Sequence, residues 1–150
     1  MREILIKAFK RHIKETLPLI EQLTEVNIMS KPCPECKEIG EVILHMVRST
    51  EFYMNGITTN QWKSLNYSLD QYDSAEAIID LATDVFKRLE VYTRMISIGD
   101  LGRTVKPFDR SATIGELLLE MIEHSIHHRG QLTVYYRFLG IKPKSISYII

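Results

Sequence analysis

The chain has few of the features that mark secreted, membrane or nucleic-acid-binding proteins. Only two of its 150 residues are cysteines, too few for a disulfide framework. Lys plus Arg and Asp plus Glu both number 19, so the net charge is zero and no single-sign field attracts nucleic acid or an anionic membrane. No apolar run is long enough to span a bilayer, and charges interrupt the apolar N-terminus, which lacks the centre of a secretory signal. We therefore expect a single cytoplasmic domain over residues 1–150 that binds neither nucleic acid nor membrane.

The two cysteines, Cys33 and Cys36, form a CxxC flanked and interrupted by prolines. A thioredoxin-like redox motif would follow a strand and open a helix, and a zinc finger would require a second pair of ligands. The sequence shows neither context. The pattern favours an incidental or mildly redox-sensitive loop pair over a catalytic one.

Apolar residues recur at three- and four-residue spacing in four segments, as is typical of amphipathic helices. The spacing predicts helices over about residues 2–26, 37–55, 73–96 and 113–139. Asp73 with Glu76, and Thr113 with Glu116, have the spacing of capping boxes, and Gly140 supplies a stop after the fourth helix. We expect an all-α four-helix bundle.

Residues 57–72 lack a sustained period and are rich in Asn, Ser, Thr and Gln. At about 3.3 Å per extended residue, such a segment easily covers a helix length of about 30 Å. It therefore predicts a crossover that lets the second and third helices run parallel. Trp62, Tyr67 and Tyr72 either line a pocket mouth or, as we favour, anchor this loop on the bundle.

The sharpest signal is a histidine cluster within the fourth helix. Three of the five histidines lie within five positions, at His124, His127 and His128. The i,i+4 spacing of His124 and His128 places both rings on one face with Cβ atoms about 5–6 Å apart, which suits two ligands of one metal ion. His127 could instead pair with His124 at i,i+3. We favour His128, because the helix stripe that carries it is more apolar.

A third ligand is expected on the second helix. His45 lies on an inward face beside the small Ser49. Taken alone, His45 would be a core histidine, as we expect for His12 on the first helix. An i,i+4 histidine pair that still requires a third ligand favours ligation by His45.

Three more residues of the fourth helix are expected to take part in the site or its packing. Glu120 precedes His124 by one turn and is a candidate partner of an imidazole or a general base. Gln131 follows His128 and is a candidate polar contact for a ligand or water. Gly130 costs roughly 1 kcal/mol relative to alanine in a helix, and we expect it to permit a close helix approach.

The motif His124-x-x-His127-His128-Arg129-Gly130-Gln131 resembles that of the DinB family of metal-binding four-helix bundles. Its helix starts with Thr-Ile-Gly-Glu-Leu-Leu, an earlier Ile-Gly-Glu precedes His45, and the turn at residues 140–143 matches as well, so the resemblance covers essentially the whole chain. It implies an up-down-down-up bundle, often a homodimer, whose metal is held by His45, His124 and His128. Many relatives have a further histidine where this chain has Glu120, so the resemblance leaves an expanded or altered ligand set open here.

The resemblance also implies a range of activities, because the family and its wider fold superfamily include thiol-dependent transferases and isomerases and proteins proposed as hydrolases. Three histidines leave a coordination position open, as in catalytic rather than structural zinc sites. We therefore expect a divalent-metal enzyme, with zinc or nickel, that acts on a small-molecule substrate as a small-thiol S-transferase or hydrolase. The alternatives are a metal-stabilised binding or stress-response protein without turnover, and a metal-free bundle whose histidines form hydrogen bonds in the core.

Overall fold

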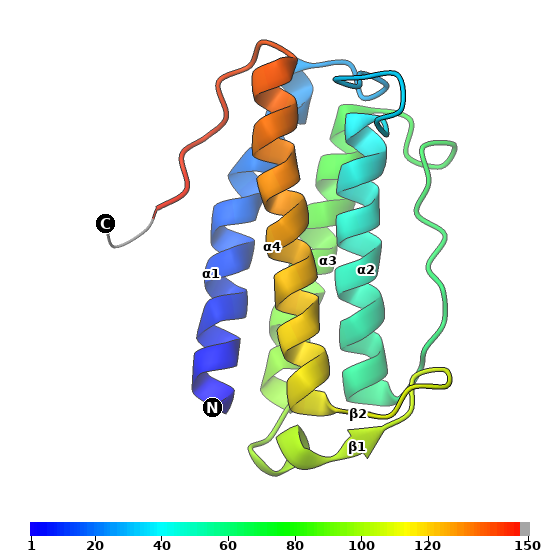
Figure 1. Cartoon of the computed structure of the whole chain (residues 1–150), viewed down its shortest axis with the longest axis vertical. Helices are drawn as coiled ribbons and strands as arrows, with labels where there is room; N and C mark the ends of the chain where they lie inside the picture. The colour runs from blue at the N-terminus through cyan, green and yellow to red at the C-terminus, as the bar shows by residue number, and fades with distance from the viewer. Residues whose placement is uncertain (148–150) are drawn as a thin grey trace.

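Four long helices make up most of the computed structural model, which describes residues 1–147 (Figure 1). They are α1 (Arg2–Glu21), α2 (Ile39–Thr59), α3 (Ala75–Met95) and α4 (Ile114–Phe138). Short elements lie between them: the 3-10 helices η1 (Gln22–Glu25) and η2 (Gly99–Gly102), and the antiparallel strands β1 (Thr104–Val105) and β2 (Ala112–Thr113). The all-α prediction is confirmed.

The direction of the helices follows the up-down-down-up order (Figure 1). α1 and α4 run one way, while α2 and α3 both run the other way, so the predicted parallel pair is present. α2 packs against α3 and α4, and α1 packs against the same two helices. One apolar core lies between all four, and its fully buried side chains include Phe9, Leu19, Ile43, Met54, Ile78, Leu89, Leu132 and Tyr136. Because α2 and α4 are direct neighbours, side chains on their facing sides can meet.

The crossover between α2 and α3 is anchored along α2. The Trp62 ring lies against Gly56, where an added Cβ atom would be only 2.3 Å from the ring. The Tyr67 hydroxyl donates a 2.6 Å hydrogen bond to the carboxylate of Glu51, which also accepts from Arg88. The anchoring expected for Trp62 and Tyr67 is therefore seen, and it places the crossover beside the middle of α2.

The helix ends agree with the sequence patterns at two of the three predicted signals. The Thr113–Glu116 capping box is present, and Gly140 has a φ of +82°, the left-handed conformation that ends α4. The cap of α3 was predicted one residue too early. The extended Ser74, not Asp73, is the N-cap, because its hydroxyl accepts the Ala77 N–H at 3.1 Å.

Two further expectations have opposite outcomes. His12 is a core residue as predicted: it is buried, and burial together with the charge of Arg129 lowers its pKa to about 3. Gly130 was expected at a close helix approach, and this is wrong. It is exposed, and an added Cβ atom would meet nothing within 4 Å.

Among residues 1–147, no helix has the length and apolar character to cross a membrane.

Candidate metal centre

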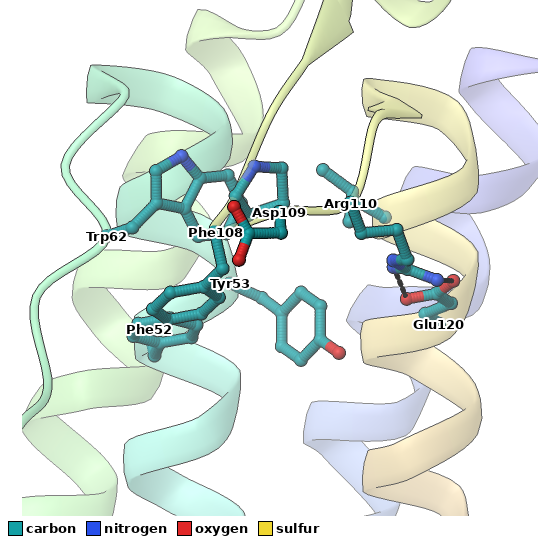
Figure 2. Close-up of a pocket in the computed structure, with 9 residues that line it drawn as sticks. Phe52, Tyr53, Trp62, Phe108, Asp109, Arg110 and Glu120 are labelled. Carbon is teal, nitrogen blue, oxygen red and sulfur yellow. Dashed lines mark hydrogen bonds and ion pairs between the residues drawn. The ribbon is translucent and has the colours of Figure 1, made fainter.

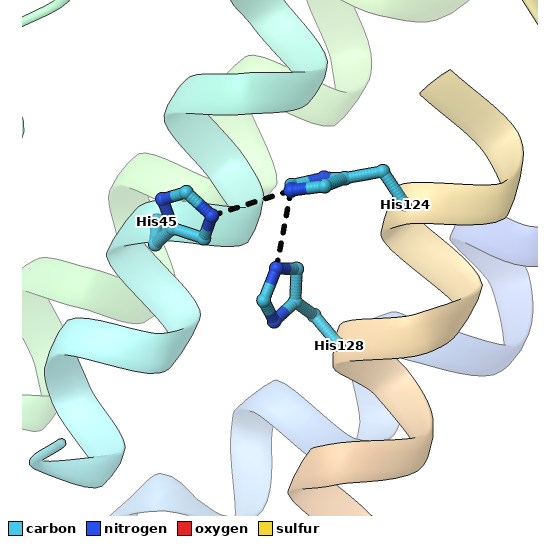
Figure 3. Close-up of side chains that lie close together, drawn as sticks. All are labelled: His45, His124 and His128. Carbon is cyan, nitrogen blue, oxygen red and sulfur yellow. Dashed lines mark hydrogen bonds between the residues drawn. The ribbon is translucent and has the colours of Figure 1, made fainter. Parts of the chain in front are cut away.

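Three imidazoles from two helices converge between α2 and α4 (Figure 3). His45 extends from the second turn of α2, and His124 and His128 extend from the middle of α4. The Nε2 atom of His124 lies 3.2 Å from Nε2 of His45 and 3.2 Å from Nε2 of His128. One ring nitrogen of each histidine lies within 4.8 Å of the other two. The i,i+4 spacing and the neighbouring positions of α2 and α4 thus bring the three predicted residues together.

The spacing of these nitrogens fits one metal ion. Two ligands held at about 2.0–2.1 Å from a tetrahedral zinc are about 3.4 Å apart, and two adjacent ligands of an octahedral ion are about 3.0 Å apart. The two distances of 3.2 Å from His124 lie between these values, and the ring nitrogens of His45 and His128 are within 4.8 Å of each other. Without an ion, the His124 Nε2 can donate its single proton to only one neighbour. The donor set and its spacing therefore suit a shared divalent cation.

The electrostatics favour the neutral imidazoles that bind metals. Burial lowers the pKa of His45 and His128 below the usual value. Burial and then the neighbouring imidazoles lower the pKa of His124 to about 4. All three rings are thus neutral at pH 7, with a lone pair available on each.

Gln131 sets the tautomer of one ring. Its side-chain oxygen Oε1 lies 2.8 Å from the Nδ1 atom of His128, and its amide donates to the Tyr135 hydroxyl at 3.3 Å. A carbonyl oxygen only accepts, so Nδ1 of His128 carries the proton and Nε2 presents its lone pair to the centre. The predicted polar residue therefore contacts an imidazole directly.

The outer nitrogens of the other two rings are less constrained. Arg48 approaches Nδ1 of His45 at 3.5 Å, but the same guanidinium nitrogen donates a 2.7 Å bond to Glu41. The long contact is too weak to fix the tautomer of His45. Nδ1 of His124 is buried and has no hydrogen-bond partner among the described residues. A ligand or water that reaches this atom would gain a hydrogen bond.

Glu120 does not contact the histidines in the way we expected. Arg110 holds its carboxylate through two hydrogen bonds of 2.7 and 2.6 Å (Figure 2), and this pairing keeps the pKa of Glu120 below its usual value. The side chain is long enough to turn to the loop that precedes α4, where the guanidinium provides a bidentate partner. Arg110 lies ten residues upstream, and no sequence spacing indicated this pair.

His127, the rival ligand, lies outside the cluster. Its side chain is exposed, and its ring centroid is 5.0 Å from that of His128. It is not one of the three histidines whose ring nitrogens converge.

A groove leads away from the histidines along α2. A cavity of about 520 Å³ reaches His45 and His124, and a second of about 610 Å³ extends from it to the Arg110–Glu120 pair (Figure 2). Both are lined by Phe52, Tyr53 and Phe108.

Phe108 forms an exposed wall of this groove. It is 73% exposed, has a φ of +58° and stacks on Phe52 with 6.0 Å between ring centroids. Sequence reasoning missed Phe108 and Arg110, because the loop between β1 and β2 has no helical period.

The comparisons with known proteins agree with this architecture. The family model of the DinB superfamily matches residues 8–132, which include all three converging histidines. The Bacillus subtilis protein YjoA is 27% identical over 142 residues, which cover 91% of this chain and 89% of YjoA. The crystal structure of YjoA, a DinB-like protein, matches with a TM-score of 0.79 and 22% identity over 97% of this chain and 99% of that one. The chain belongs to the DinB superfamily.

Proposed function

We propose that His45, His124 and His128 hold one divalent metal ion, zinc or nickel, and that the protein is an enzyme of the small-thiol S-transferase or hydrolase type. The observation that carries this proposal is the convergence of three Nε2 atoms from two helices. Among the described residues, no fourth Cys, Asp, Glu or His belongs to the cluster. Three protein ligands with an open position are the arrangement of catalytic zinc sites.

The residues around the centre have separable tasks in this proposal. Gln131 holds the proton on Nδ1 of His128 and so directs its Nε2 atom to the ion. The aromatic groove that begins at His45 and His124 holds the organic part of a substrate and keeps water away from it. A bound divalent ion would supply a Lewis acid that makes a water or a thiol acidic near neutral pH.

The choice of a small thiol rests on the family resemblance together with the groove. The DinB family and its wider fold superfamily include thiol-dependent transferases, and the cavities described above are of the size that holds small organic ligands, roughly 300–1,000 Å³. The same resemblance supports a homodimer. It does not distinguish transfer to an electrophile from hydrolysis, so both reactions belong in the test.

The test starts with elemental analysis of protein purified without an affinity tag. We expect about one divalent ion per chain, lost when His45, His124 or His128 is changed to alanine and kept in His127→Ala. The metal-loaded protein is then assayed with panels of thiol–electrophile pairs and of esters and amides. Turnover that disappears in His124→Ala supports the enzyme. Bound metal without turnover across both panels would overturn it in favour of a metal-stabilised binding protein.

A further inference from the structure

The loop between η1 and α2 carries a Cys33–Cys36 disulfide that the proposed metal centre does not use. The two Cα atoms lie 5.1 Å apart, within the range of roughly 4.4–6.8 Å usual for disulfides. Both cysteines are partly buried rather than enclosed in the core. The spacing of the two residues is therefore usual for a disulfide, and the pair is partly open to solvent.

A backbone turn keeps the two cysteines together. The N–H of Cys36 donates to the carbonyl of Cys33 at 3.1 Å, with Pro34 at the second position of the turn. Proline has the backbone angle that this position requires. Because this hydrogen bond does not involve the sulfurs, the turn can persist after reduction and hold both thiols ready to close again.

Cys36 opens into a cavity next to the histidines. The cavity has a volume of about 400 Å³, and its lining includes Cys36, the charged neighbours Glu35 and Lys37, and the histidines His45 and His128, but not Cys33. A molecule held there lies against Cys36 and not against Cys33. Lys37 is an exposed residue of this lining, and its ammonium can bind a carboxylate and stabilise an anionic sulfur beside it. Because Glu35 also lines the cavity, these features suit a small thiol that carries an ammonium group as well as a carboxylate.

We propose that Cys33–Cys36 is a thiol–disulfide exchange site that accepts a low-molecular-weight thiol in this cavity, with Cys36 as the sulfur attacked. The thiolate of the small molecule forms a bond to Sγ of Cys36, the Cys33–Cys36 bond breaks, and its electron pair leaves on Sγ of Cys33, which takes a proton from water. A second molecule of the same thiol attacks the mixed disulfide and releases Cys36. In total, two thiols are oxidised to one disulfide while the pair is reduced to two thiols.

This site is chemically separate from the three histidines, although it shares a cavity wall with two of them. The exchange requires no metal ion, so it stands or fails independently of the proposed metal enzyme. Its chemistry depends on which sulfur the small thiol can reach, and the cavity makes that sulfur Cys36.

The test uses the full-length, chelated protein with reduced glutathione as the probe. Samples are quenched with acid at short times, and peptide mass spectrometry locates the mixed disulfide. We expect glutathione on Cys36 rather than Cys33, followed by full reduction of the pair without denaturant. Lys37→Glu should slow the reaction with glutathione about fivefold and the reaction with the carboxylate-free 2-mercaptoethanol about twofold. Lys87→Glu, a remote exposed lysine on α3, is the matched control and should leave both rates unchanged.

Two results would overturn the proposal: a disulfide that resists millimolar thiol in the folded protein, or glutathione trapped mainly on Cys33. The double variant Cys33→Ser/Cys36→Ser should keep its metal, and His124→Ala should keep the exchange, because His124 does not line this cavity. These two variants distinguish failure of the exchange site from failure of the metal enzyme. If His124→Ala abolishes the exchange in chelated protein that still folds, the site is not independent and the proposal is wrong.

Discussion

The side-chain oxygen of Gln131 lies 2.8 Å from Nδ1 of His128, one turn away on the same helix. This contact gives His128 a defined tautomer, with its proton on the outer nitrogen and its lone pair directed at Nε2 of His124. The Gln131 amide is thus a direct neighbour of the candidate metal centre. The consequence can be measured without any knowledge of the substrate.

Gln131→Leu should weaken metal binding by roughly 10- to 100-fold, the usual effect of losing a hydrogen-bond partner of a ligating histidine. Gln131→Glu keeps an oxygen acceptor at the same position and should retain most of the affinity. Competition with a chelator of known affinity, followed by elemental analysis, measures both variants. Equal affinities for Gln131→Leu and wild type would show that the contact does not orient His128.

Acidification should destabilise the metal-free protein in the range where histidines titrate. His12 and His124 have pKa values near 3 and 4 in the folded chain, both below the ordinary 6.5. Between those values and 6.5 the unfolded chain binds more protons, so the free energy of unfolding falls as pH falls. Each such histidine contributes at most about 1.4 kcal/mol per pH unit.

Urea unfolding of the chelated protein between pH 7 and pH 5 tests this effect. In this range the carboxylates with lowered pKa values, including Glu116 and Glu120, are mostly charged in the folded and the unfolded chain and contribute little. His12→Gln removes one of the four histidines with a lowered pKa, the others being His45, His124 and His128, and should make the dependence less steep, whatever its effect on stability at pH 7. A dependence as steep as that of the wild type would refute the assignment to His12.

Metal-loaded protein should in addition release its ion as pH falls, since the ligands must be neutral.

Glu120→Gln should leave metal affinity within about twofold of wild type, well below the 10- to 100-fold effect of a lost imidazole partner. The reason is that Arg110, and not a histidine, binds this carboxylate. Gln131→Leu, on the same helix, serves as the positive control. Strong loss of metal in Glu120→Gln would restore the role first expected for this residue. The same chelator competition provides the measurement.

Much of the architecture could be predicted because it depends on local patterns. The four helices follow from apolar spacing, and the parallel arrangement of α2 and α3 follows from the length of the segment between them. The meeting of His45 with His124 and His128 could be anticipated from helix faces. Whether these residues bind metal stays a prediction, since convergence shows geometry and not occupancy.

The errors concern interactions between residues that are distant in sequence or ambiguous at one position. Glu120 shares a helix face with His124, but its direction is decided by Arg110 in a loop without periodicity. Asp73 and Ser74 are both good capping residues, and only the backbone path shows that Ser74 is the cap. The cavity beside Cys36 could not be predicted either, because it depends on how the loop that carries Cys36 packs near residues of α4 such as His128.

Two helical glycines should respond oppositely to alanine. Gly56 lies under the Trp62 ring, and an added Cβ atom 2.3 Å from that ring must displace it, which should cost about 1–3 kcal/mol. Gly130 faces open space, so alanine there should stabilise the protein by about 0.5–1 kcal/mol through helix propensity alone. Urea unfolding of the chelated protein gives both values.

Trp62 is the single tryptophan of the chain, so its fluorescence reports the crossover directly. We expect a shifted emission in Gly56→Ala and none in Gly130→Ala. Similar stabilities for the two variants would mean that Trp62 does not pack on α2. In that case Trp62 would not line the groove beside Phe52 either.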